Sequence, residues 1–155
     1  LKMDQAVVYD PTRNDLFTAS KGRGAYMNDR RIRVSKRVRM NESLIATGIP
    51  FAGAGDPAEW TAIYNALAPQ VAGIRRFGAA ALDLAWVAAG RYEGFWESGL
   101  KPWDTAAGCL LVREAGGFVT DWRGRSQPIC DQQILAGNDA IHSRLHKIVA
   151  SEILG

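Results

Sequence analysis

Two carboxylates in the second half of the chain stand where they could take part in metal or phosphate chemistry. The segment ESGLKPWDTAAG runs from Glu97 to Gly108, and in it Asp104 opens a predicted helix after a strand and a glycine-containing turn. This position is the C-terminal end of a strand, which is the usual ligand edge of open α/β sheets. Mg²⁺ prefers carboxylate oxygens and retains several waters, so Asp104 can supply one ligand but not a whole site.

Each of these residues also has a simpler structural interpretation. Asp104 could only cap its helix, by accepting hydrogen bonds from amides of the first turn. Glu97 could be a solvated acid at a strand end, and the small residues 106–108 are typical of close helix packing. None of these signals decides the function alone.

The elements that must position the carboxylates follow two patterns. Short strands are predicted at 6–9, 16–19, 25–27 and 31–34, as an antiparallel meander. Beyond residue 43, strands are predicted at 44–47, 74–77, 92–96, 118–121 and 134–136, and helices at 57–67, 79–89, 102–115 and 140–153. Glycine and proline mark the helix limits, and Asp56 is expected to cap the first helix. The second pattern predicts a layered α/β domain. We therefore divide the chain into residues 1–40, strands completing an N-terminal sheet whose other strands lie outside the chain, and residues 41–155, a C-terminal α/β subdomain.

The composition is that of a globular protein. The 155 residues are 47% hydrophobic and 23% charged, enough to bury a real core, and no apolar run approaches the length of a membrane span. The first residues contain no signal sequence and no initiator methionine, so we expect the chain to be a fragment of a longer protein. We expect a cytoplasmic protein in which Cys109 and Cys130 are both reduced.

Six cations fall within ten residues: Arg30, Arg31, Arg33, Lys36, Arg37 and Arg39. Such a run could contact RNA or another acidic partner. However, Ile32 and Val34 alternate with polar residues at the period of a half-buried strand, so the charges are more simply explained as the solvent-exposed face of an edge strand.

Several stretches together resemble the inositol monophosphatase family. The segment 103–108, WDTAAG, is similar to the core of the family's second signature, and 112–117, VREAGG, is another familiar stretch. Further similarity lies at 9–11, 17–19, 21–26, 31–35, 75–85 and 134–138, so the resemblance covers nearly the whole chain. It implies the C-terminal part of a layered αβαβα sugar-phosphatase fold of the bacterial type.

The resemblance also implies roles for individual residues. Asp104 would be the catalytic ligand of the second metal ion and would face the substrate. Glu97 would accept hydrogen bonds from substrate hydroxyls, and Arg75 would line the same pocket or order its neighbours. The implied substrate-binding residues are Arg75, Gly78, Ala79, Ala80, Glu97 and Asp104.

One departure from the family pattern matters as much as the match. The family's metal-binding glutamate and its Asp-Gly-Thr signature are absent, and Asp10-Pro11-Thr12 is followed by Arg13 rather than by another acid. The resemblance thus implies Mg²⁺-dependent hydrolysis of inositol 1-phosphate or a similar small polyol or sugar phosphate by a homodimer, with this chain inactive alone. Two alternatives stay open: a non-enzymatic partner of RNA or protein, or a related phosphatase acting on fructose bisphosphate, histidinol phosphate or a 3′-phosphonucleotide.

Overall fold

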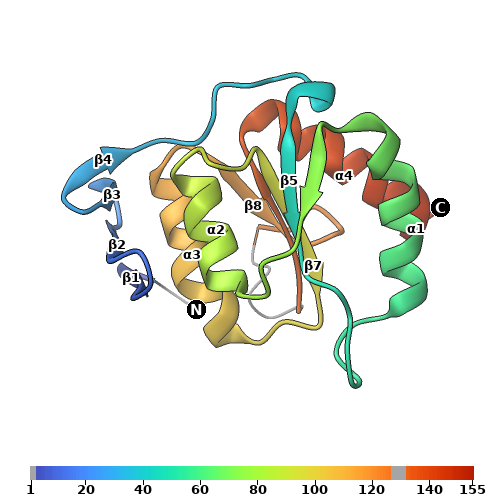
Figure 1. Cartoon of the computed structure of the whole chain (residues 1–155), viewed down its shortest axis with the longest axis horizontal. Helices are drawn as coiled ribbons and strands as arrows, with labels where there is room; N and C mark the ends of the chain where they lie inside the picture. Colours follow the sequence, from blue (N-terminus) through green and yellow to red (C-terminus); the bar gives the residue numbers. More distant parts are fainter. Residues whose placement is uncertain (1–2, 127–131) are drawn as a thin grey trace.

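The chain folds into four layers, in the order sheet, helices, sheet, helices (Figure 1). The computed structural model describes residues 3–126 and 132–155. Helices α2 (Ala80–Ala88) and α3 (Pro102–Glu114) lie between the two sheets, and α1 (Pro57–Leu67) and α4 (Asp139–Ile153) cover the far face of the second sheet. The predicted α/β class is therefore confirmed.

The first sheet is an antiparallel meander. Its strands are β1 (Gln5–Asp10), β2 (Asp15–Ser20), β3 (Gly24–Met27) and β4 (Arg30–Ile32), paired in chain order. Residues alternate strictly along β1, so that Ala6 and Val8 are buried while Val7 and Tyr9 are exposed. This alternation places one face of the sheet against α2 and α3 and leaves apolar side chains on the other face.

The second sheet is mixed, with strand order β6-β5-β7-β9-β8. Its strands are β5 (Leu44–Thr47), β6 (Gly73–Arg75), β7 (Gly94–Ser98), β8 (Phe118–Thr120) and β9 (Gln133–Gly137). Strand β5 runs parallel to β6 and β7, whereas β9 is antiparallel to both of its neighbours. The two central parallel strands, β5 and β7, therefore end at the same edge of the sheet.

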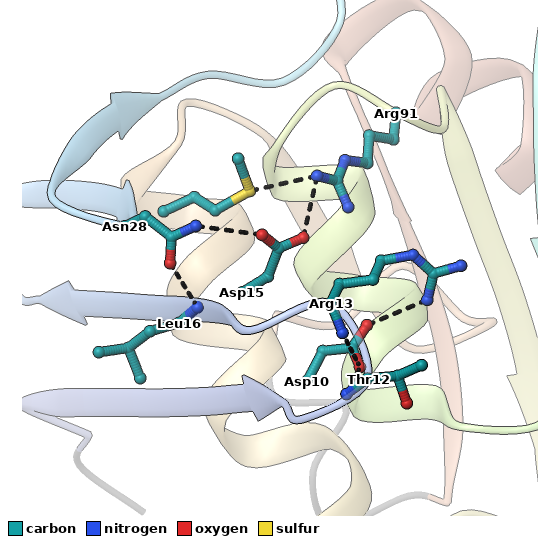
Figure 2. Close-up of polar contacts among 8 residues, drawn as sticks. Asp10, Thr12, Arg13, Asp15, Leu16, Asn28 and Arg91 are labelled. Carbon is teal, nitrogen blue, oxygen red and sulfur yellow. Dashed lines mark hydrogen bonds and ion pairs between the residues drawn. The ribbon is translucent and has the colours of Figure 1, made fainter.

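Polar contacts fasten the first hairpin to the end of α2, as Figure 2 shows. Asp10 accepts hydrogen bonds from the backbone of Thr12 and Arg13 and pairs with the Arg13 guanidinium at 3.1 Å. Asp15 pairs with Arg91, which follows α2, at 3.1 Å. The Arg13 guanidinium also lies 5.3 Å from the ring centroid of Trp86 on α2. These polar contacts add to the apolar packing of the meander against the central helices.

Most predicted elements appear within two residues of their expected bounds, and Asp56 caps α1 as its sequence indicates. The strand predicted at 31–34 is wrong at its end. It stops at Ile32 because the Val34 amide donates instead to the carbonyl of Ala115, after α3. The chain then runs without regular structure to the short 3-10 helix η1 (Met40–Glu42), so only Arg30 and Arg31 of the basic run belong to an edge strand.

Three further predictions concern the cysteines, membrane spans and the division of the chain. Cys109 is a free thiol whose burial raises its pKa to about 12, whereas Cys130 lies outside the described residues. Among the described residues, no helix is both long and apolar enough to cross a membrane. The division at residue 40 stays a prediction.

The two central helices approach each other closely at Gly108. A Cβ added there would be 2.5 Å from the Cβ of Leu84, which is buried in α2. We therefore expect Gly108→Val to lower the free energy of unfolding by about 2 to 3 kcal/mol, because the two helices must separate. Urea unfolding followed by circular dichroism measures this. Ala58→Val, at an exposed position of α1, is the control and should lower the free energy of unfolding by less than about 1 kcal/mol. An equal loss of stability in both variants would contradict the packing argument.

Candidate functional site

A cleft of about 200 Å³ opens at the edge of the second sheet where β5 and β7 end. Its lining residues are Gly48, Ile49, Pro50, Phe51, Ala54, Arg76, Gly78, Ala79, Ala80, Glu97, Ser98, Gly99, Leu100 and Asp104. The cleft therefore combines the residues after β5, the end of β7 and the first residues of α2 and α3. This edge of an open sheet is where ligands of α/β proteins usually bind.

Asp104 is half-buried at the third position of α3. Its Oδ2 accepts a hydrogen bond of 2.8 Å from the backbone amide of Lys101, the residue that precedes the helix. Its Oδ1 has no hydrogen-bond partner among the described residues. The two interpretations of the sequence are therefore compatible, since one oxygen closes the start of the helix and the other remains available to a ligand.

Glu97 lies at the end of β7, half-buried in the same cleft. Space for its carboxylate comes from Gly48, where an added Cβ would lie 1.9 Å from Oε1. Burial, together with the negative charges of Asp83 and Asp104, raises the pKa of Glu97 to about 7, although the positive charge of Arg76 opposes the change. A carboxyl that holds its proton near neutral pH can donate as well as accept hydrogen bonds.

The predicted backbone turn, Gly78-Ala79-Ala80, lies at the entrance of α2. Gly78 has a φ of +82°, a left-handed conformation that glycine adopts without strain, and Ala79 has no side chain that could cap the helix. The first amides of α2 thus carry the partial positive charge of a helix N-terminus without a side-chain acceptor. Such amides suit a hydroxyl or an anionic group.

The two arginines of the Arg-Arg pair differ in their relation to the cleft. Arg76 lines the cleft, and the expected Arg75 does not. The Arg75 Nη1 donates to the carbonyl of Ile74 at 3.0 Å, and both arginines line a neighbouring groove with Trp60 and Tyr64. Sequence reasoning missed Arg76 because adjacent residues point to different sides of an extended segment, and the motif alone does not show which one faces the cleft.

Asp83 is the other group that sequence reasoning missed. It is completely buried in α2, and neither carboxylate oxygen has a partner among the described residues. Burial raises its pKa to about 7, and Arg76 partly offsets this. The available signal was its position as the one acid within an apolar helical stretch, where a charge is costly.

The described residues do not form a metal site by themselves. In residues 3–126 and 132–155 no group of three or more histidine, cysteine, aspartate or glutamate side chains is arranged to hold an ion. In the cleft, the raised pKa of Glu97 leaves Asp104 as the main anionic oxygen donor. One carboxylate fits Mg²⁺ as a partial ligand only.

The layered fold and the acidic cleft define a class of α/β proteins, in which small polar ligands usually bind at the strand ends. The chain belongs to the inositol monophosphatase family, whose family model matches residues 2–154. The resemblance seen in the sequence is thereby confirmed.

Individual relatives support the same assignment. The chain is 46% identical to inositol-1-monophosphatase of Mesorhizobium japonicum over 92% of this chain and 54% of that protein. It is 50% identical to the Nus factor SuhB of Pseudomonas aeruginosa, over 88% of this chain and 51% of the relative. The crystal structure of extragenic suppressor protein suhB from Bartonella henselae superposes with a TM-score of 0.93 at 47% identity, covering 98% of this chain and 58% of that one. The chain thus spans about half the length of the curated relatives it matches.

The buried acids should make folding stability depend on pH. Because the folded-state pKa of Glu97 rises from 4.5 to about 7, the native state binds more protons than the unfolded state in that interval. Stability should therefore fall as pH rises from about 4.5 to about 7, and Asp83 should act in the same sense from 3.8 to about 7.

Glu97→Gln and Asp83→Asn should each flatten this dependence, since neither amide titrates. Urea unfolding of the wild type and both variants across this pH range measures the slope. Glu59→Gln, on the exposed face of α1, is the matched control and should leave it unchanged. A wild-type stability that rose over the same interval would contradict the raised pKa values.

Proposed function

We propose that this chain supplies the C-terminal half of the active site of a Mg²⁺-dependent phosphomonoesterase. Its substrate is inositol 1-phosphate or a similar small polyol or sugar phosphate. The supporting observation is the free Oδ1 of Asp104 in the same cleft as Glu97 and the uncapped start of α2. The name of the Mesorhizobium relative points to the same activity.

In this proposal each part of the cleft has one task. Asp104 contributes one oxygen to the metal ion, which when bound neutralises phosphate charge and activates water. Glu97 bonds the ring hydroxyls, and the amides at Gly78, Ala79 and Ala80 contact the ring through the backbone. Arg76, with its fixed positive charge at the cleft, balances the acids and attracts the phosphate.

The remaining metal ligands come, in this proposal, from residues outside the 155. Two apolar side chains support this. Trp103, next to Asp104, is 77% exposed, and Phe51, which lines the cleft, is 68% exposed. Large aromatic groups left in water beside a polar site suit a surface that further protein covers. We also propose that the complete protein is a cytoplasmic homodimer.

A second candidate function is a non-enzymatic role as a partner of RNA or protein. The Pseudomonas relative is named a Nus factor, and the cations of residues 30–39 are largely exposed. The two functions do not exclude each other, because the cations lie outside the cleft lining.

Release of phosphate from inositol 1-phosphate with Mg²⁺ tests the main proposal. The 155-residue chain alone should be inactive, because one carboxylate cannot organise the ions. A longer protein containing this chain should be active, and Asp104→Asn in it should lower kcat by about 100-fold or more. Fructose bisphosphate, histidinol phosphate and a 3′-phosphonucleotide, assayed in parallel, distinguish the related phosphatases. An Asp104→Asn protein with wild-type activity would refute the role of Asp104.

Two different substitutions should disturb the carboxylate of Glu97. Glu97→Gln changes the hydrogen bonding of this side chain, and Gly48→Ala displaces it, since the new methyl group would overlap the Glu97 Oε1. In the longer protein we expect both to raise KM for inositol 1-phosphate by about tenfold, the value of one or two hydrogen bonds. Gly53→Ala is the control, because nothing lies within 4 Å of its added Cβ; the left-handed φ of +85° strains an alanine there, so this variant should lose some stability but keep the wild-type KM. Unchanged KM in both test variants would remove Glu97 from the substrate site.

A further inference from the structure

A second hollow lies at the opposite end of β5 from the cleft. It has a volume of about 440 Å³ and is lined by Arg39, Met40, Asn41, Gln70, Arg144, Lys147 and Ile148. These residues come from η1, from the short 3-10 helix η2 (Ala68–Gln70) and from one face of α4. We call this hollow the basic groove. The run of cations in the sequence contributes only Arg39 to it and does not reveal the other two cations, because Arg144 and Lys147 lie more than a hundred residues further along the chain.

The basic groove carries positive charge and no acid of its own. Arg144 and Lys147 are exposed, lie three residues apart on α4, and have no ion-pair partner among the described residues. Arg39 pairs with Glu42 at 3.2 Å, and both side chains are largely exposed, so water screens the pair. An exposed pair of this kind contributes little and yields readily to a stronger anion.

Hydrogen bonds to its backbone hold the segment 35–39, which leads into the groove, while most of its cationic side chains are exposed to solvent. The side-chain amide of Asn138 donates to the carbonyls of Ser35 at 3.0 Å and Arg37 at 2.7 Å. The Ser43 hydroxyl donates to the carbonyl of Arg39 at 2.7 Å. Lys36 and Arg39 are exposed, whereas Arg37 is tied to buried Glu93 at 3.2 Å. Recognition here therefore involves side-chain charge on a preorganised backbone.

This arrangement favours a phosphate chain over an acidic peptide. An extended peptide gains affinity by pairing with free backbone groups, but the carbonyls of Ser35, Arg37 and Arg39 are already engaged. Phosphates need only cations, and arginine binds them in a bidentate manner. The open, shallow groove also lacks the buried charged group that a specific small-anion site would have.

We propose that the basic groove binds single-stranded nucleic acid through its phosphates, with Arg39, Arg144 and Lys147 as the main contacts. Met40 and Ile148 give an apolar floor for sugars, and the side-chain amides of Asn41 and Gln70 can bond sugar hydroxyls. Binding of this kind is independent of base sequence and sensitive to salt. It goes beyond the phosphatase proposal and uses none of the cleft residues.

Fluorescence anisotropy of a labelled RNA of about 20 nucleotides tests this on the purified chain, with DNA of the same sequence as a second arm. Three phosphate contacts predict a loss of affinity of roughly tenfold or more when salt rises from about 50 to about 200 mM. Arg144→Gln with Lys147→Gln should remove two contacts, weaken binding about tenfold at low salt and reduce the salt slope. Tighter binding of RNA than of DNA would assign a role to the 2′-hydroxyl; equal binding would assign the phosphates alone.

Matched controls decide whether the groove itself is responsible. Lys21→Gln with Arg23→Gln, in the exposed turn between β2 and β3, removes the same charge and should leave affinity within about twofold. Equal weakening by both double variants would overturn the groove as a site, as would displacement of RNA by poly-glutamate at the same charge concentration.

Thermal unfolding by circular dichroism checks that the variants fold. If the α4 double variant is destabilised, Arg39→Gln, on a different element, gives an independent test and should weaken binding severalfold. Because the assay contains neither Mg²⁺ nor a phosphomonoester substrate and measures binding rather than phosphate release, its result is independent of whether the longer protein proves to be a phosphatase.

Discussion

The contact between α2 and α3 at Leu84 and Gly108 is the constraint on which the site depends. Ala80 lies four residues before Leu84, and Asp104 lies four residues before Gly108, so each is about one helical turn, or roughly 6 Å, ahead of the contact. The missing side chain at Gly108 lets the helices approach closely, and this brings both helix entrances to the same strand ends. The geometry of the cleft is thus set by packing in the core, where positions are most tightly determined.

A large part of this arrangement could be predicted from the sequence. Short apolar runs bounded by turn-forming residues located β1 and β2, glycine and proline marked the helix limits, and Asp56 identified the start of α1, because each of these signals is local. The position of Asp104 at a helix entrance followed in the same way. The family resemblance then connected Glu97 and the turn at Gly78 to the same site.

The remaining features depend on contacts between distant segments, which no local pattern encodes. The burial of Asp83 reflects the two sheets that enclose α2, and the choice between Arg75 and Arg76 reflects which side of the chain faces the cleft. The strand expected to reach Val34 ends early because a carbonyl 81 residues further along the chain, that of Ala115, captures the amide. Periodicity indicates which face is apolar but not what will cover it.

Asn138 joins two parts of the molecule through one side chain. Its Oδ1 accepts a hydrogen bond from the amide of Ile141 at the start of α4, while its Nδ2 donates hydrogen bonds to the carbonyls of Ser35 and Arg37. Fraying of the helix start would release the irregular segment that runs from the first sheet to the second, and loosening of that segment would weaken the helix start. We therefore expect these two segments, distant in the sequence, to open as one cooperative unit whose amides share a common protection against hydrogen exchange.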